Sequence, residues 1–200
     1  MQVKKYSVGM MENNVYLLWD HESKMACIID ASGKEKQIAE DAAKLGLDVQ
    51  YIILTHGHFD HTDGLDFYKA AFPAAKLVAA KKEAKMLYDR KLSKGKGGIV
   101  ADIQVEDGDS IMLGKNEVKF IGTPGHSSGS ICILAGKNLF SGDTLFQASV
   151  GRTDFPTGSW DDLEASIHNK LFVLPDDTRV LPGHMDETTI GFEKRYNPFV

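Results

Sequence analysis

The heptapeptide THGHFDH, residues 55–61, follows the apolar run YIIL directly and constrains this chain more than any other feature. It holds three of the chain's seven histidines together with an aspartate. In an extended backbone residues two apart point to the same side, so His56 and His58 can reach one metal ion. Asp60 and His61 come where the chain must turn and can face a second ion. The alternative is a histidine-rich surface loop.

Three further junctions place one metal-ligand residue type beside a glycine at the end of an apolar run. They are TPGHSSG with His126, LFSGDTLF with Asp143 and VLPGHMD with His184. Glycine lets the backbone turn sharply, while the strand fixes where the side chain points. Any one of these residues alone is an ordinary loop residue. Together with the heptapeptide they predict a site for zinc, iron or manganese, whose ligands are imidazole and carboxylate.

The composition predicts one soluble domain over residues 1–200, since 42% of the 200 residues are hydrophobic. A net charge of −5 argues against a nucleic-acid groove. We expect no membrane partner and a cytoplasmic location, because no segment reads as a secretory signal or a membrane span. Cys27 and Cys132 lie in apolar strand-like runs, and two such residues are not a disulfide framework. We expect a monomer or a small homo-oligomer.

The order of short strands and helices in the first half of the chain is repeated, in similar form, in the second half. A helix is predicted over residues 33–47 with Gly46 at its end, and a charged surface helix over 81–92. The loop SKGKGG, 93–98, separates the halves. A helix over 159–175 should begin at the cap Ser159 and stop at Pro175. Strands are expected at 3–8, 14–20, 25–30, 51–55, 76–80, 102–105, 110–114, 116–123, 130–136, 138–142 and 178–184. We predict a single α/β domain, a four-layer αββα sandwich.

The four motifs, in this order and spacing, resemble those of the metallo-β-lactamase superfamily, and Asp30 in IIDAS matches its early aspartate. GDTLFQASVGRTDFPTGS and GFEKRYNPF resemble the short bacterial hydroxyacylglutathione hydrolase-like (glyoxalase II-like) proteins. The resemblance implies that Asp143 bridges two divalent metal ions, most simply zinc, with iron or manganese as alternatives. It assigns His56, His58 and His126 to one ion, and Asp60, His61 and His184 to the other. Met185 departs from the pattern, which usually has a small residue there.

The resemblance implies a hydrolase that cleaves a thioester of a low-molecular-weight thiol, such as S-lactoylglutathione, with a metal-bound hydroxide. Asp60 would also orient the attacking water, and Asp30 would hold a ligand histidine in place. One alternative is a persulfide dioxygenase with a single iron on His56, His126 and Asp143. Another is a lactone hydrolase of the same fold. A class B β-lactamase is disfavoured, because those enzymes commonly have cysteine where Asp143 stands.

Four other residues are of types that can bind or react. Arg152, in SVGRTDFPTGS, is a candidate to bind a carboxylate of the thiol carrier, and the resemblance supports it. Ser127 completes a G-x-S-x-G pattern, but a strand-like run follows it instead of the helix that a nucleophile elbow requires. His21 and His168 do not stand at a strand end beside glycine, so we expect surface or packing roles for both.

Overall fold

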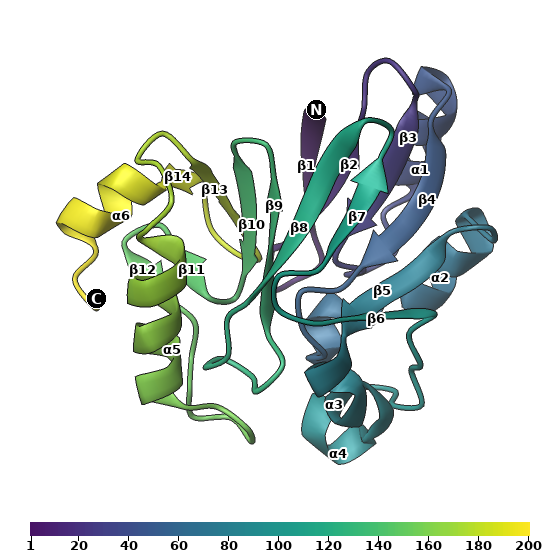
Figure 1. Cartoon of the computed structure of the whole chain (residues 1–200). Helices are drawn as coiled ribbons and strands as arrows, with labels where there is room; N and C mark the ends of the chain where they lie inside the picture. The colour runs from purple at the N-terminus through teal and green to yellow at the C-terminus, as the bar shows by residue number, and fades with distance from the viewer.

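Two six-stranded sheets lie face to face in the computed structural model, which describes all 200 residues (Figure 1). The first sheet has the order β1-β2-β3-β4-β5-β6, antiparallel at its start and parallel from β3 onward. Its strands are β1 (Gln2–Val8), β2 (Asn13–Trp19), β3 (Met25–Ile29), β4 (Asp48–Ile53), β5 (Lys76–Ala80) and β6 (Ile103–Val105).

The second sheet has the order β14-β13-β10-β9-β8-β7, in which only β10 and β13 run parallel. Its strands are β7 (Ser110–Leu113), β8 (Asn116–Gly122), β9 (Ile131–Ala135), β10 (Asn138–Gly142), β13 (Arg179–Pro182) and β14 (Thr188–Thr189). A small separate hairpin pairs β11 (Leu145–Phe146) with β12 (Ser149–Val150). Every predicted strand is therefore present, and β11, β12 and β14 are additional.

Helices cover the two outer faces of this pair of sheets (Figure 1). α1 (Lys36–Leu45) and α2 (Leu65–Ala71) lie on the first sheet. α5 (Trp160–Ser166), its continuation as one π-helical turn (Ile167–Leu171) and α6 (Ile190–Tyr196) lie on the second. The predicted αββα sandwich is confirmed, and no helix is long and apolar enough to cross a membrane.

Three apolar layers hold the four layers of the sandwich together. Strand β2 contributes to two of these layers, because its side chains alternate between the two faces of the first sheet. Val15 and Leu17 pack beneath α1 and α2, whereas Tyr16 and Leu18 pack between the sheets. A third layer joins the second sheet to α5 through Leu163, Ile167 and Leu171. The sheets are thus apolar on both faces, and polar residues concentrate at their ends.

The helix ends follow the sequence signals with one correction. Gly46 ends α1 in the left-handed conformation, at φ 65°. Ser159 caps α5, since its side chain accepts a hydrogen bond from the Asp162 amide. The expected stop at Pro175 is wrong by one turn. The helix ends at Leu171. Its last turn is π-helical, so the Phe172 amide donates to the Ile167 carbonyl, five residues back, at 2.8 Å.

The prediction of one charged surface helix over 81–92 is also wrong. This segment divides into a 3₁₀ turn (Lys81–Glu83), α3 (Ala84–Tyr88) and α4 (Arg90–Ser93). The break falls at Asp89, whose extended backbone and side chain cap α4. Glu83, Met86 and Leu87 are buried. The segment thus lies at the surface with its lysines exposed, as predicted, but it is not one helix and it buries Glu83 as well as two apolar side chains.

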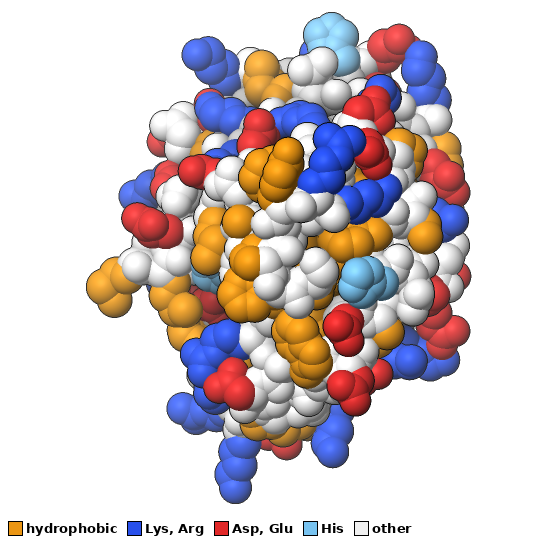
Figure 2. Space-filling view, turned by 90° about the vertical axis from the view of Figure 1, so that its left-hand side faces the viewer, with side chains coloured by type: hydrophobic (Ala, Val, Ile, Leu, Met, Phe, Trp, Pro, Cys, Tyr) orange, Lys and Arg blue, Asp and Glu red, His pale blue; other side chains and the backbone are white.

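Large apolar side chains interspersed with charged ones are exposed on the outer face of α5 and α6 (Figure 2). They include Trp160, Val173, Phe192, Tyr196 and Phe199. These side chains lie outside the three apolar layers. Substituting one of them by alanine therefore measures how much unfolding free energy is lost when a side chain outside the core is truncated.

Candidate metal centre

The seven ligand candidates come from four separated segments and meet at one end of the sandwich. Four follow β4 and its adjoining 3₁₀ turn (Phe59–His61), and the others follow β8, β10 and β13. The structure brings all seven together in three overlapping groups whose ligand atoms lie within 4.8 Å of one another. The groups are His56, His58 and His126; His56, His61 and Asp143; and Asp60, His61 and His184.

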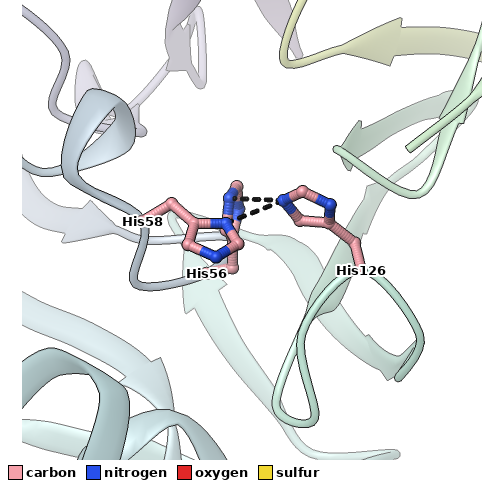
Figure 3. A group of neighbouring side chains, drawn as sticks. All are labelled: His56, His58 and His126. Atoms are coloured by element: carbon pink, nitrogen blue, oxygen red, sulfur yellow. Dashed lines mark hydrogen bonds between the residues drawn. The ribbon is translucent and has the colours of Figure 1, made fainter. Parts of the chain in front are cut away.

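His56, His58 and His126, called here the first ligand group, converge from two loops (Figure 3). The Nε2 atom of His126 lies 2.8 Å from His58 Nδ1 and 3.2 Å from His56 Nε2. Nitrogen ligands around a tetrahedral ion are about 3.3 Å apart, given metal–nitrogen bonds of about 2.0–2.1 Å. All three side chains are nearly inaccessible to solvent. Their spacing therefore suits a single metal ion.

Asp60, His61 and His184, the second ligand group, stand beside them. His61 Nε2 lies 3.6 Å from Asp60 Oδ2, and His184 Nε2 lies 3.4 Å from the same oxygen. Asp143 lies between the two groups, with Oδ1 3.3 Å from His61 Nε2 and Oδ2 3.6 Å from His126 Nε2. Asp143 Oδ1 is buried and accepts no hydrogen bond. A cation between the groups would satisfy that oxygen.

The electrostatics of the cluster favour a bound cation. Burial lowers the pKa of His58 to about 4. For Asp143 burial acts against ionisation, but the positive charge of His61, 3.3 Å away, holds the pKa at about 2. Burial likewise opposes a charge on His61, yet Asp143 and Asp30 raise its pKa well above the ordinary value. The carboxylates of Asp143 and Asp30 thus place negative charge in a buried site, and a bound metal ion can neutralise that charge.

Hydrogen bonds to the outward ring nitrogens fix how the histidines point. His61 Nδ1 donates to Asp30 Oδ2 at 2.8 Å. His126 Nδ1 donates to the backbone carbonyl of Arg152 at 2.7 Å, and His184 Nδ1 to that of Met11 at 3.1 Å. Each bond leaves Nε2 free to face the centre. Asp30 thus occupies the orienting position that was expected of it.

Glycine is required at two positions that border the cluster. A Cβ on Gly183 would lie 2.4 Å from Asp143 Oδ1 and 2.7 Å from His61 Cε1. A Cβ on Gly151 would lie 1.7 Å from the Asp143 carbonyl oxygen. Gly183 therefore lets the loop after β13 approach the Asp143 carboxylate, and Gly151 lets the loop after β12 approach the Asp143 backbone.

The cluster opens into a cavity of about 530 Å³. Its lining includes Phe59, Phe146, Phe155, Met11 and Met185, beside the ligands. Met185 is half exposed on the rim and has the left-handed backbone, at φ 68°, which costs a side chain with a Cβ about 1–2 kcal/mol. The walls are therefore largely apolar, and the polar groups gather at the floor and at one edge.

Two cations stand at that edge of the cavity. Arg152 lines the cavity as predicted, but its guanidinium is exposed and makes a bidentate pair with Asp154 at 2.9 and 2.7 Å. Lys94 places its Nζ 4.0 Å from the centre of the Phe155 ring, whose other neighbour is the Arg152 guanidinium at 4.3 Å. Lys94 has no carboxylate within 4.0 Å, unlike Arg152. It is the freer of the two cations.

Sequence reasoning missed Lys94 and Asn13. Lys94 stands in a loop that reads only as a linker, so its sequence context offers no signal. The Asn13 amide donates to Asp60 Oδ2 at 3.0 Å and lies 3.4 Å from both His61 Nε2 and His184 Nε2. Asn13 opens a strand, far from the motifs in the sequence, and only its burial beside Asp60 marks it. His21 and His168 are exposed, away from the cluster, as expected.

Ser127 is not placed as a nucleophile. Its side chain is fully buried, and its hydroxyl bonds Glu83 Oε2 at 3.0 Å and Ser130 Oγ at 2.7 Å. No histidine accepts its proton. We expect Ser127→Ala, assayed at saturating metal, to keep most of its rate, and a serine-directed covalent inhibitor to leave this position unlabelled. Loss of several orders of magnitude together with a trapped acyl-serine would contradict this.

Neither cysteine offers a nucleophile or a ligand. Cys27 and Cys132 are both free and fully buried. Burial raises the pKa of Cys132 to about 11, with Thr123 acting weakly against it, and burial also raises the pKa of Cys27. A thiol that stays protonated does not attack or ligate. The imidazole and carboxylate groups are therefore the only chemistry gathered at this site.

Comparison with known proteins places the chain in a family. The model of the Metallo-beta-lactamase superfamily matches residues 8–184, and the chain belongs to this superfamily. The fold and the cluster together support a metal-dependent hydrolase. The hydroxyacylglutathione hydrolase GloC of Haemophilus influenzae is 32% identical over 210 residues, spanning 100% of this chain and 98% of that protein.

Two solved structures share the fold at comparable sequence identity. The structure of the BLEG-1 B3 metallo-beta-lactamase has a TM-score of 0.91 at 35% identity, with 99% of both chains covered. The structure of ETHE1 from Myxococcus xanthus has a TM-score of 0.82 at 31% identity, with 99% of this chain and 84% of that chain covered. These relatives share one architecture under different names, so the fold alone does not select the substrate.

Proposed function

We propose that this protein is a cytoplasmic hydrolase that cleaves thioesters of a low-molecular-weight thiol at a pair of divalent metal ions. The observation that carries the proposal is the position of Asp143 between the two ligand groups, with one buried oxygen that accepts no hydrogen bond. The similarity to a protein named hydroxyacylglutathione hydrolase supports the thioester class. The negative net charge and the small apolar cavity suit a small-molecule substrate and no nucleic acid.

In this proposal the first ligand group would hold one ion and the second the other, with Asp143 as a ligand that the two groups would share. The donor set of imidazole and carboxylate fits zinc best, with iron or manganese as alternatives. A metal pair supplies two things when bound: a lower pKa for water, from 15.7 towards about 7, and polarisation of a carbonyl oxygen. All the side-chain contacts of Asp60 fall on Oδ2. We expect Asp60 Oδ1 to orient the attacking water.

The cavity suggests how the substrate lies. The acyl group would contact Met11, Phe146 and Met185 near the ligands, while the thiol carrier would reach the cationic edge at Arg152 and Lys94. A thiolate is a good leaving group, so no strong general acid is required of the protein. Phe155 packs edge-on against His58 at 5.3 Å and holds that side of the cavity in place.

Arg152→Ala should raise KM about fivefold for a thioester whose carrier bears carboxylates, with kcat little changed. The guanidinium is exposed, and an exposed charge pair contributes about 1 kcal/mol at most. Its contact is remote from the scissile bond, so it stabilises the substrate and the transition state equally. Arg152→Lys should recover part of the loss. Steady-state kinetics on matched thioesters with and without carboxylates would measure this.

Asp154→Asn is the matched control, because it frees the same guanidinium. It should lower KM for the carboxylate-bearing thioester and leave the neutral one unchanged. If Arg152→Ala weakens both thioesters equally, or neither, Arg152 does not bind the carrier.

A persulfide dioxygenase with one iron is the second candidate. His126 Nε2 stands 3.6 Å from Asp143 and 3.2 Å from His56, so two histidines and one carboxylate are at hand. That arrangement leaves the second ligand group without a role, which favours the hydrolase. A lactone hydrolase would use both groups, with a different acyl substrate.

Metal analysis of protein purified without added metal, followed by assays of each substrate class, tests the proposal. Two equivalents including zinc, with thioester hydrolysis, would support it. One iron, with oxygen uptake that depends on a thiol persulfide, would overturn it in favour of the dioxygenase. Two metal equivalents with hydrolysis of a lactone or a β-lactam but no thioester would refute the substrate class and retain the metal pair.

A further inference from the structure

Glu83 is a buried carboxylate that the proposed reaction does not use. It ends the 3₁₀ turn after β5, and only 1% of it is exposed. No lysine, arginine or histidine nitrogen lies within 4.0 Å of it. A buried charge without a cationic partner is costly unless hydrogen bonds compensate it. Burial raises the pKa of Glu83, and hydrogen bonds from Gly57, Ser127 and Gly129 act against this.

The hydrogen bonds of Glu83 reach both loops of the first ligand group. Its Oε1 accepts from the backbone amide of Gly57 at 2.9 Å, and its Oε2 accepts from the Ser127 hydroxyl at 3.0 Å. Gly57 stands between His56 and His58, and Ser127 follows His126. One carboxylate therefore joins the two loops that carry all three histidines.

The surroundings of Glu83 are shaped to keep this contact. A Cβ on Gly129 would lie 2.4 Å from Glu83 Oε2, so only glycine lets that loop close on the carboxylate. A Cβ on Gly57 would lie 3.1 Å from Met86 and 3.2 Å from Leu87, two buried apolar side chains. The contact is therefore close-packed on both sides of the carboxylate.

We propose that Glu83 is a positioning residue for the first ligand group. It sets the separation of His56 and His58 from His126 and thereby the metal affinity of that group, without touching a ring nitrogen itself. Asp30 accepts directly from His61 Nδ1 in the second ligand group. It also accepts from the Thr55 hydroxyl, which lies 3.1 Å from His56 Nδ1, so Asp30 reaches both groups. The bonds of Glu83 reach only the loops of the first ligand group. The inference requires metal binding by these residues and no particular substrate.

Metal affinity at each half of the centre tests the proposal without any assay of activity. The metal-free protein is titrated with Zn²⁺ against a chelator, and with Cd²⁺ by cadmium NMR, whose signals are assigned through coupling to labelled histidine rings. Glu83→Gln keeps the shape of the side chain. Its amide nitrogen cannot accept the hydrogen bonds that Ser127 and Gly129 donate to the Glu83 carboxylate. We expect about 10- to 100-fold weaker binding at the first ligand group, as for other partners of metal ligands. The second group should change less than about threefold.

Asn13→Ala is the matched control, because the Asn13 amide approaches Asp60, His61 and His184 and no ligand of the first group. We expect the opposite pattern from it, with changed binding at the second ligand group. Equal weakening at both groups in Glu83→Gln would overturn the proposal, because a general loss of structure acts on both. A lower melting temperature of the metal-free protein with unchanged affinities would also overturn it.

If Glu83→Gln does not fold, Ser127→Ala tests the positioning role of Glu83 instead. It removes one bridge to the carboxylate and leaves the bond to Gly57. Weakening of about threefold to tenfold, confined to the first ligand group, would support the proposal. No change, or the same change at both groups, would refute it. Hydrolysis of thioesters enters none of these measurements, so the failure of the proposed function leaves the result intact.

Discussion

Asp143→Ala is expected to abolish hydrolysis and lower the metal content of the purified protein together. Asp143 is the one side chain whose oxygens approach both ligand groups, at 3.3 Å from His61 and 3.6 Å from His126 and His184. Its removal takes away the charge that offsets the repulsion between two cations. The loss in kcat/KM should be about 10³-fold or more, since ions at such a site contribute several kcal/mol to the transition state. Elemental analysis and steady-state kinetics measure the two effects.

His21→Ala is the control for Asp143→Ala, because His21 is exposed and outside every ligand group. It should keep full metal content and full turnover. Near-normal turnover in Asp143→Ala would show that the two halves of the centre do not work through a shared carboxylate. The assignment of a metal pair would then have to be abandoned.

Phe140→Ala should destabilise the fold by about 3–5 kcal/mol, the usual cost of removing a fully buried phenylalanine side chain. Phe140 lies on β10 in the apolar layer between the sheets, and no part of it is exposed. Its ring meets the Tyr16 ring edge-on at 5.1 Å, so the substitution opens a cavity between the two halves of the chain. Equilibrium unfolding in urea measures the free-energy change.

Phe199→Ala is the matched control, since 52% of that side chain is exposed and it lies outside the apolar layers. Its effect should stay within about 0.5 kcal/mol, as for other surface positions. A similar loss in both variants would mean that the interface between the sheets is not the main apolar core.

The sequence predicted the elements that local rules control. Residues at a period of two gave the strands, and the spacing of Ile38 and Ala42 gave α1 with Gly46 at its end. The ligand set was also predictable. Strands fix the direction of the side chains that follow them, and five of the seven ligand candidates stand beside a glycine at such an end, while Asp60 and His61 lie in the adjoining 3₁₀ turn. Those residues are brought together at one end of the sandwich, as the motifs implied.

The helix over 81–92 shows where local reasoning fails. Its lysines are exposed as predicted, but the burial of Glu83 depends on Gly57 and Ser127, which are 26 and 44 residues away. Helical periodicity reports which residues share a face, and it does not report what that face will contact. The π-helical turn after α5 has the same cause, since packing against the second sheet outweighed an otherwise regular pattern.

The sequence by itself therefore determined the layered fold and the seven clustered ligand candidates, because both depend on short-range pattern and on the ends of strands. Only the tertiary structure decided the partners of those residues. It placed the Asn13 amide on Asp60, the Arg152 carbonyl on His126 and the Glu83 carboxylate on Ser127. Most of these contacts join segments dozens of residues apart. Their geometry is set by how the sheets pack, which no local pattern encodes.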